Sequence, residues 1–548
     1  MISSETTGYY QALVDIGSNG IRFSISDMSP QSSRTMPTIY QDRSGISLYD
    51  AQYSTGTKAP IPFTVIQEVL AALIRFKSTC NDFGVLDSNI RVVATEATRN
   101  AINRDDLLGA IEQKTGWTVQ LLAKEEEGRL GAMGIASSVD DLKGICMDMG
   151  GGSVQLTWVV KRPTGDIEMG PSTSFPYGAA ALLAELSTRE QVGLEEEVCT
   201  RLQNAIEKEL GIPQWLWEEA IRNNGFNLYL SGGGFRGWGH LLMSHARIQP
   251  YPIPIINGYR VSNLEFFPNI STPLDGSKSH RISTRRASQV PAVQLLLRAM
   301  AKAQLQVSYA TFVQGGVREG LLYEGLPPPI RAENALVAAT LPYAPPSAAA
   351  FHQLLDCFTL VTAALRVATI NLLYTHGPIT KDIRAAAALR STTTGILASA
   401  NGLDHLERGM LALILCERWD ADLPDTDTGL LNSMIEVCGP YLSWCAAFMG
   451  RIAKGIASLY PAGLVKEGGQ KVSLETIFPQ ASQVPESNSP AIPESCHLKI
   501  NLLSEDVGTV SLVNDWAKDL AKLGKKKHWH NGIKGLNVHI EVVPARTA

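Results

Sequence analysis

Short apolar runs separated by glycine-rich turns mark the first third of the chain. Ala12–Ile16 leads into a Gly-Ser-Asn-Gly turn at 17–20, and Ile21–Ser26 then alternates apolar and polar residues as a returning strand does. Ile66–Phe76 has helical spacing, and strand and helix patterns alternate between residues 91 and 122. This order predicts an α/β domain.

The opening pattern occurs a second time further along the chain. The apolar run Ile145–Met149 leads into Gly-Gly-Gly-Ser at 150–153, and the strand-like run Val154–Val160 follows. A third glycine turn, Ser231–Gly234, follows Asn227–Leu230. Glycine turns of one kind at the ends of several strands predict that these turns line one cleft in a duplicated fold.

The second half of the chain has a different pattern. Ala348–Leu459 is rich in Ala and Leu with helical periodicity, whereas Val465–Ser495 is rich in Gly, Pro and Ser, as linkers are. We therefore expect five parts: a first lobe (1–137 plus about 301–326), a second lobe (138–300), a helical domain (345–462), a linker (463–495) and a small β-α-β unit (496–548).

Composition narrows the classes of function. The chain has 548 residues, 45% of them hydrophobic, and a net charge of -5. It has no overall basic field, so we expect no direct nucleic-acid partner, and a polyanion has to be bound at a local site. Met1–Tyr10 has no basic region followed by an apolar stretch, and we see no membrane segment. We expect a cytoplasmic protein.

Two of the glycine turns follow an aspartate. Asp15 precedes Ser18, Asn19 and Gly20, and Asp148 precedes the Gly-Gly-Gly-Ser turn. Small turn residues let backbone N–H groups approach an anion, and carboxylates and phosphates both suit Mg²⁺. Facing turns would hold a phosphoryl group with a metal ion between the two aspartates. The alternative for each turn taken singly is an ordinary hairpin with an Asp cap.

The chain is identified as resembling the exopolyphosphatase/guanosine pentaphosphate phosphatase family over about its first 330 residues, and more weakly beyond. The ordered motifs that carry this resemblance are Asp15–Arg22, Ala94–Asn103, Glu125–Leu130, Asp148–Ser153, Phe175–Gly178 and Ser231–Gly234. The resemblance implies an actin-like, ribonuclease H-like duplicated two-lobed core, followed by a mainly helical domain and a small α+β unit.

The resemblance also implies roles for individual residues. Glu127 would be the general base, and repulsion within Glu125–Glu127 would raise its pKa. Asp15 and Asp148 would hold Mg²⁺. The residues expected to bind the phosphates of ATP or polyphosphate are Ser18, Asn19, Gly20, Arg22, Arg99, Gly150, Gly151, Gly152, Ser153, Gln155, Gly232, Gly233 and Gly234. Arg22 and Arg99 could each form a surface ion pair instead.

One departure from the family pattern affects the expected activity. Active members typically have Glu where this chain has Gln155, and an amide removes one negative charge while it keeps hydrogen-bonding capacity. The motif forms most resemble a fungal group of the family, which implies a sensor in mitochondria-to-nucleus signalling that acts through protein partners. The alternative is an active Mg²⁺-dependent exopolyphosphatase or nucleotide phosphohydrolase that uses Glu127. A homodimeric assembly is left open.

Overall fold

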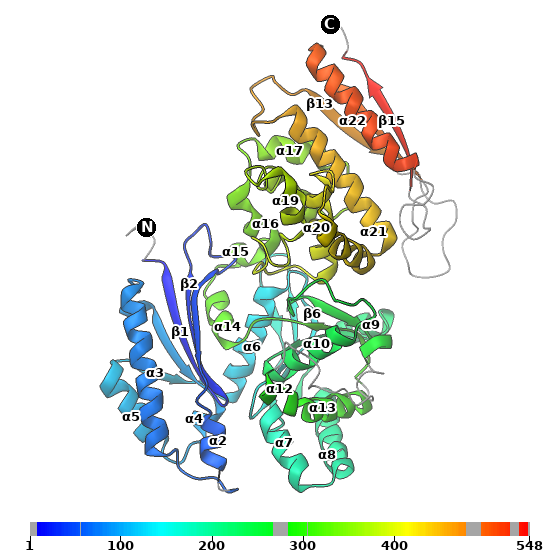
Figure 1. Cartoon of the computed structure of the whole chain (residues 1–548). Helices are drawn as coiled ribbons and strands as arrows, with labels where there is room; N and C mark the ends of the chain where they lie inside the picture. The colour runs from blue at the N-terminus through cyan, green and yellow to red at the C-terminus, as the bar shows by residue number, and fades with distance from the viewer. Residues whose placement is uncertain are drawn as a thin grey trace. The chain divides into compact units, whose positions relative to one another are not determined.

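The computed structural model describes residues 8–54, 56–266, 283–303, 305–477, 495–525 and 536–545. The chain divides into two compact units. The first unit consists of Met1–Ala246 with Ile256–Ala335, and the second of Arg247–Ile255 with Leu336–Ala548. The elements of each unit are labelled in Figure 1.

A five-stranded sheet forms the first lobe of the first unit. In pairing order its strands are β3 (Thr38–Ser44), β2 (Gly20–Asp27), β1 (Tyr10–Gly17), β4 (Ile90–Ala94) and β5 (Val119–Leu121). The pairs β3–β2 and β2–β1 are antiparallel, and the pairs β1–β4 and β4–β5 are parallel.

Alternation along β1 determines which way its side chains point. Val14 belongs to a core with residues of α3 (Phe63–Asp82) and α5 (Arg104–Thr115), whereas Leu13 packs with residues of α6 (Lys124–Ser138). Asp15 is two residues from Leu13, so it lies on the face of the sheet that α6 covers. This is how the sequence directs Asp15 towards the helix that carries Glu127.

A seven-stranded sheet forms the second lobe. Its path is β11 (Tyr259–Ser262), β12 (Val307–Phe312), β10 (Phe226–Ser231), β6 (Lys143–Met149), β7 (Val154–Lys161) and β8 (Ile167–Met169), and β9 (Thr173–Phe175) pairs with β7. Here β6 and β7 form an antiparallel hairpin, and β6 pairs in parallel with β10, just as β1 and β2 form a hairpin beside parallel β4. The duplicated, actin-like two-lobed core is confirmed.

The sequence prediction placed all of residues 301–326 in the first lobe. The structure places only part of this segment there. Its strand β12 joins the second sheet, and only α14 (Val317–Glu324) packs against α6 and β1. Because Gly315 adopts a φ of 116° between these two elements, the chain turns there from one lobe to the other.

The second unit begins with helices. They are α16 (Ala335–Thr340), α17 (Ala348–Leu355), α18 (Ala363–Asn371), α19 (Lys381–Leu389), α20 (His405–Glu417) and α21 (Asp425–Leu459). Helix α21 bends at Gly439, which has a φ of 73° and precedes Pro440. Among the described residues, no helix has the length and hydropathy that a bilayer span requires.

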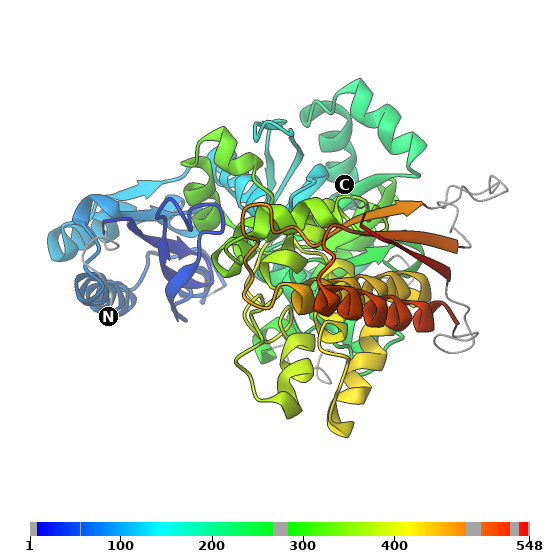
Figure 2. The same ribbon diagram turned by 90° about the horizontal axis from the view of Figure 1, so that it is seen from above.

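A three-stranded sheet follows in the same unit. Strand β14 (Ser495–Leu502) pairs in parallel with β15 (Asn537–Val543), and α22 (Val507–Lys525) connects them along one face, as Figure 2 shows. The predicted linker is wrong over β13 (Val472–Ile477), which pairs antiparallel with β14. Val472 and Leu474 alternate into the core, a signal too short to stand out in a polar stretch. Residues 478–494 of the predicted linker lie outside the described residues.

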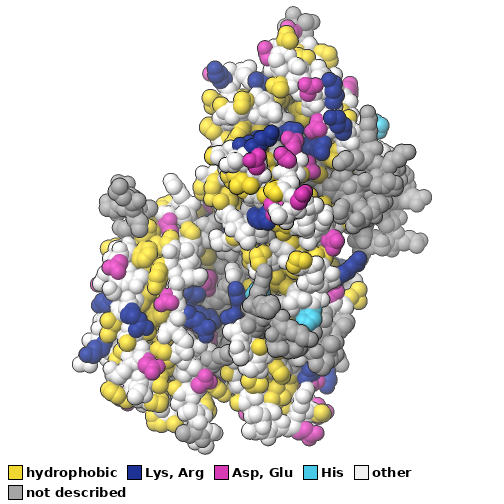
Figure 3. All heavy atoms as spheres, in the orientation of Figure 1, with side chains coloured by type: hydrophobic (Ala, Val, Ile, Leu, Met, Phe, Trp, Pro, Cys, Tyr) yellow, Lys and Arg dark blue, Asp and Glu magenta, His cyan; other side chains and the backbone are white. Residues whose placement is uncertain are grey.

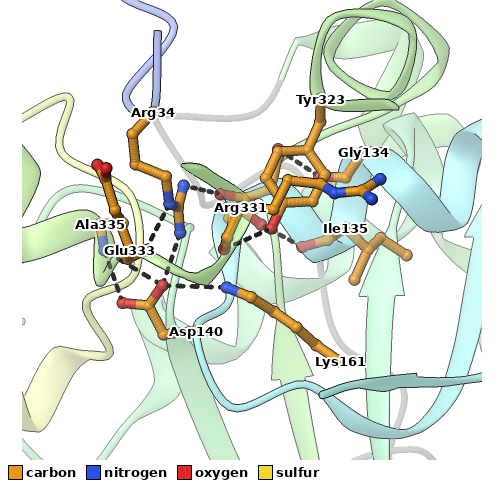
Figure 4. Close-up of polar contacts among 11 residues, drawn as sticks. Arg34, Gly134, Ile135, Asp140, Lys161, Tyr323, Arg331, Glu333 and Ala335 are labelled. Carbon is orange, nitrogen blue, oxygen red and sulfur yellow. Dashed lines mark hydrogen bonds and ion pairs between the residues drawn. The ribbon is translucent and has the colours of Figure 1, made fainter. Parts of the chain in front are cut away.

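A buried polar network ties together three segments of the first unit (Figure 4). The Asp140 carboxylate accepts a hydrogen bond from Arg34 Nη2 at 2.7 Å and one from the backbone N–H of Ala335 at 3.0 Å. Lys161 Nζ lies 3.5 Å from the same carboxylate. One aspartate therefore joins the loop after β2, strand β7 and the last residue of the unit.

Candidate functional site

The first two glycine turns face each other across the first unit. A Cβ atom added at Gly151 would overlap with the side-chain amide of Asn19, and one added at Gly152 would overlap with Glu96 and lie 3.4 Å from Ser18 Oγ. A side chain at either position would therefore have to displace Asn19 or Glu96, and glycine avoids this where the two lobes approach each other. The structure brings the two predicted turns together.

The second turn has a fixed shape. The Gly150 N–H donates to the carbonyl of Ser153 at 2.9 Å, and the Gly178 N–H donates to the carbonyl of Gly152 at 3.1 Å. In the first turn, Gly20 packs against the Ser44 carbonyl of β3. These backbone hydrogen bonds and this packing contact hold the turns in place. They do not involve the hydroxyl groups of Ser18 and Ser153.

The third turn encloses Asp148. Gly232 has a φ of 94°, and a Cβ atom there would overlap with Asp148 Oδ1. On its other side, Gly131 of α6 comes within 3.3 Å of Asp148 Oδ2, measured from an added Cβ atom. Of the other two predicted glycines, Gly234 packs against Met149, whereas Gly233 faces open space at the start of α10 (Gly233–His245).

Asp15 and Asp148 occupy equivalent places in the two hairpins. Asp15 pairs in register with Arg22, and Asp148 pairs in register with Gln155. Arg22 Nη1 lies 3.7 Å from Asp15 Oδ2, with 48% of its side chain exposed. The duplication thus gives one aspartate a cation as its cross-strand partner and the other a neutral amide.

Glu127 lies near the start of α6 with only 13% of its side chain exposed. Burial raises its pKa to about 7, against the opposing effect of Arg99, whose Nη1 lies 3.3 Å from Glu127 Oε2. Arg99 also donates to the carbonyl of Leu122. A carboxyl group poised near neutral pH suits proton transfer. The phosphate-binding role of Arg99 stays a prediction.

The cause of the raised pKa differs from the one expected from the sequence. Glu125 is exposed, and the hydrogen bond from Arg129 lowers the pKa of Glu126. The acidic residues whose charge raises the pKa of Glu127 are Glu96 and Asp15, both distant in sequence. Burial and cross-chain neighbours, and not the run of three glutamates, therefore set the pKa of Glu127.

Acidic side chains converge beside the turns. Burial raises the pKa of Asp148 to about 6, with Arg22 opposing the shift and Asp15 and Glu319 adding to it. The described residues contain no group of three or more His, Cys, Asp or Glu arranged to hold a metal ion. Mg²⁺ often uses only one or two protein carboxylates with water and phosphate, and it would relieve the repulsion between Asp15 and Asp148. The donor set fits that ion.

A cluster of arginines lies near the same turns, and Arg22 is the member that the sequence predicted as a phosphate ligand. Burial lowers the pKa of Arg236 on α10, and the charge of Arg22 lowers it further. Burial also lowers the pKa of Arg286 on α12 (Thr284–Ser288), as do the charges of Arg236, Arg43 and Arg22. Figure 3 shows basic side chains gathered where the two lobes of the unit meet. Mutually repelling, partly buried cations favour a polyanionic ligand.

The missed arginines differ in how visible they are in the sequence. Arg236 lies two residues after the third glycine turn, so its place in the sequence could have indicated a contact with the ligand. Arg43 is visible only once β3 pairs with β2, because it then lies opposite Arg22.

Hydroxyl groups surround Gln155, a side chain that is 6% exposed. Its Nε2 donates to Ser153 Oγ at 2.8 Å and to Ser174 Oγ at 3.4 Å. Gly128, the residue after Glu127, packs on Ser172, because an added Cβ atom there would overlap with Ser172 Oγ and lie 3.4 Å from Gln155 Cγ. Gln155 and these serines are therefore neighbours of the candidate base.

Comparisons with known proteins agree with these features. Residues 24–328 match the Ppx/GppA phosphatase family, and residues 334–547 match the RTG2 C-terminal domain. Retrograde regulation protein 2 of Saccharomyces cerevisiae is 39% identical over 482 residues, which cover 83% of this chain and 82% of the yeast protein. Exopolyphosphatase 1 of Mycobacterium leprae is 25% identical over 57% of this chain and 88% of its own length.

Solved structures of similar proteins match a little over half of the chain. A Ppx/GppA family member from Aquifex aeolicus matches 57% of this chain and 96% of its own, with 19% identity and a TM-score of 0.46. An exopolyphosphatase from Cytophaga hutchinsonii matches 58% of this chain and 99% of its own, with 19% identity and a TM-score of 0.45.

Proposed function

The chain belongs to the Ppx/GppA phosphatase family, and we propose that it is a regulator that binds a nucleotide or polyphosphate in its first unit and signals to protein partners. The observation that carries the proposal is Gln155. It places a neutral amide opposite Asp148, within a pair of glycine turns that is otherwise complete. Binding is therefore expected to persist where catalysis is weakened.

Several features support phosphate binding. Asn19 and Gly151 bring the two turns into contact, so backbone N–H groups of both turns can approach one phosphoryl group. Arg22, Arg236 and Arg286 would offset the charge of a chain of phosphates. Asp15 and Asp148 would hold Mg²⁺, which when bound supplies charge neutralisation at the phosphate oxygens.

The regulatory part of the proposal comes from the similarity to the yeast protein. That protein is named for retrograde regulation, and the similarity extends over the second unit, which matches the RTG2 C-terminal domain. We infer that this chain is a cytoplasmic sensor in signalling from mitochondria to the nucleus. Ligand-dependent closure of the two lobes would change the surface offered to a partner.

An active hydrolase is the second candidate, and the state of Glu127 favours it. A buried carboxyl group with a pKa of about 7 can accept a proton from an attacking water at neutral pH. In this case Gln155 would only adjust the affinity for the metal, and the chain would release phosphate from polyphosphate or a nucleotide.

Phosphate release separates the two candidates. We would assay polyphosphate, ATP and guanosine pentaphosphate with Mg²⁺, using the native chain, Glu127→Gln and Gln155→Glu. Glu125→Gln is a matched control, because Glu125 is exposed two residues before Glu127. The proposal expects no sustained release by the native chain and measurable release by Gln155→Glu. Native turnover that stops only in Glu127→Gln would establish the hydrolase.

A further inference from the structure

Helix α12 ends in a serine that follows two arginines. The sequence at this point is Arg285-Arg286-Ala287-Ser288, and the Ser288 side chain is exposed to solvent. Serine/threonine kinases that select basic substrates recognise arginines two and three residues before the serine with acidic groups of their own, because matching charge patterns direct such pairing. Ser288 therefore has the sequence context and the exposure of a kinase substrate.

The local structure lets a kinase reach this serine. Ser283 caps α12 by accepting a hydrogen bond from the backbone N–H of Arg286, and α13 (Val290–Lys302) begins two residues after Ser288. Val290 is buried, so the start of α13 is anchored, whereas α12 has only five residues. A helix this short gains little stability from its own hydrogen bonds. It can open locally while α13 stays folded, and a kinase can then bind it as an extended peptide.

Arg286 has a second possible partner, inside the first unit. Helix α12 packs against α10 and α13, as Figure 1 shows, and a Cβ atom added at Gly237 of α10 would lie 3.5 Å from Arg286 Cβ. Burial lowers the pKa of Arg286, and the charges of Arg236, Arg43 and Arg22 lower it further. A polyanion bound at these arginines would relieve their repulsion and hold Arg286 against α10.

A kinase and a bound polyanion would therefore compete for the same guanidinium group. The kinase needs Arg286 to leave α10, whereas the polyanion keeps it there. In the other direction, a phosphate on Ser288 adds about 1.5 to 2 negative charges two residues from Arg286, where it repels a polyanion and can pair with the guanidinium in its place. Coupling between two binding events is reciprocal, so each event should weaken the other.

We propose that Ser288 is a phosphorylation site, and that a phosphate on Ser288 and a polyanion in the first unit oppose each other. In the modification, Ser288 Oγ forms a bond to the γ-phosphorus of ATP, the bond from that phosphorus to the oxygen shared with the β-phosphate breaks, and ADP leaves. The hydroxyl proton passes to a carboxylate of the kinase. The mutual opposition rests on the proposed function, whereas the modification of Ser288 does not.

The first experiment incubates the full chain with the catalytic subunit of cAMP-dependent protein kinase, Mg²⁺ and a limiting concentration of ATP, and locates the phosphate by mass spectrometry. Phosphate should be found on Ser288 and be lost in Ser288→Ala. Ser187→Ala is the matched control, because Ser187 is exposed on α7 (Ala179–Thr188) and no arginine precedes it there. Saturating tripolyphosphate, at constant free Mg²⁺, should slow phosphorylation of the chain at least threefold. It should not slow phosphorylation of a peptide with the sequence 284–291.

Calorimetry then compares tripolyphosphate binding by the unmodified chain and by the chain phosphorylated on Ser288. The phosphorylated chain should bind about three- to tenfold more weakly, and the difference should shrink at high salt, because the charges lie within about one Debye length, roughly 10 Å.

Four results would count against these expectations. No phosphate on Ser288, while the peptide is phosphorylated, would overturn the inference. So would an equal rate of phosphorylation with and without tripolyphosphate, or equal affinities of the two chains, once calorimetry shows that tripolyphosphate binds the unmodified chain. If neither tripolyphosphate nor ATP binds the unmodified chain, the proposed function and the mutual opposition fail together, although phosphorylation of Ser288 would stand.

Discussion

Replacing Asp140 by Asn removes the only carboxylate seen to pair with two buried cations within the described part of the first unit. The side chains of Arg34 and Lys161 are 2% and 5% exposed, and Asp140 lies 2.7 Å and 3.5 Å from them. Leaving buried charges without their partner costs about 3 to 5 kcal/mol. Since Asn keeps one oxygen as acceptor, we expect about 3 kcal/mol, at the lower end of that range.

The assay is calorimetric melting of the full chain, in which the transition of the first unit is followed. For a unit of this size, about 3 kcal/mol corresponds to a decrease in Tm of roughly 4 to 6 °C. Asp141→Asn is the matched control, because Asp141 is the exposed neighbour and should leave Tm within about 1 °C.

The pH dependence of the same variant tests the cause. Burial, with the charge of Arg34 adding to it, already lowers the pKa of Lys161, and loss of Asp140 would lower that pKa further. The folded variant then favours neutral Lys161, so the loss of stability seen at neutral pH, where Asp140 of the native chain is ionised, shrinks as the pH rises through the folded pKa of Lys161. An unchanged Tm at pH 7, or a loss that does not shrink with rising pH, would refute the reasoning.

Three further predictions concern other parts of the molecule. Gly151→Ala should weaken ATP binding in calorimetry, because its Cβ atom would displace the Asn19 side chain from the facing turn, whereas Gly193→Ala, with no atom within 4 Å of the added Cβ, should bind normally. Any phosphate release that depends on Glu127 should increase as the pH rises through about 7. The reason is that burial raises the pKa of that carboxyl group, and only its ionised form accepts a proton. A rate that does not change from pH 5.5 to 8.5 would contradict this. Arg408→Met should destabilise the second unit by about 3 kcal/mol in calorimetric melting, because buried Arg408 donates to the carbonyls of Thr392, Leu397 and Ala400. Lys381→Met is the control and should leave the stability unchanged, because Lys381 is exposed.

The sequence was sufficient for the parts of the site that local patterns encode. An apolar strand, an aspartate and a glycine turn are contiguous, so Asp15 and Asp148 and their turns could be located from the order of residues alone. The duplicated lobes followed, because the same pattern occurs twice.

Properties that depend on distant residues could not be predicted. The pKa of Glu127 is set by burial and by Arg99, Glu96 and Asp15, which reach it only through the fold. The donor role of Gln155 depends on Ser174, which becomes its neighbour when β9 pairs with β7. Strand β13 escaped detection because its partner β14 lies on the other side of residues 478–494.

The function proposed for the first unit is phosphate binding without efficient catalysis. The most direct measurement titrates ATP and polyphosphate into the native chain by calorimetry while phosphate release is followed in the same samples. We expect saturable binding to one site with no sustained release of phosphate, and weaker binding by Gly151→Ala. Sustained release that disappears in Glu127→Gln, or no binding by the native chain, would contradict it.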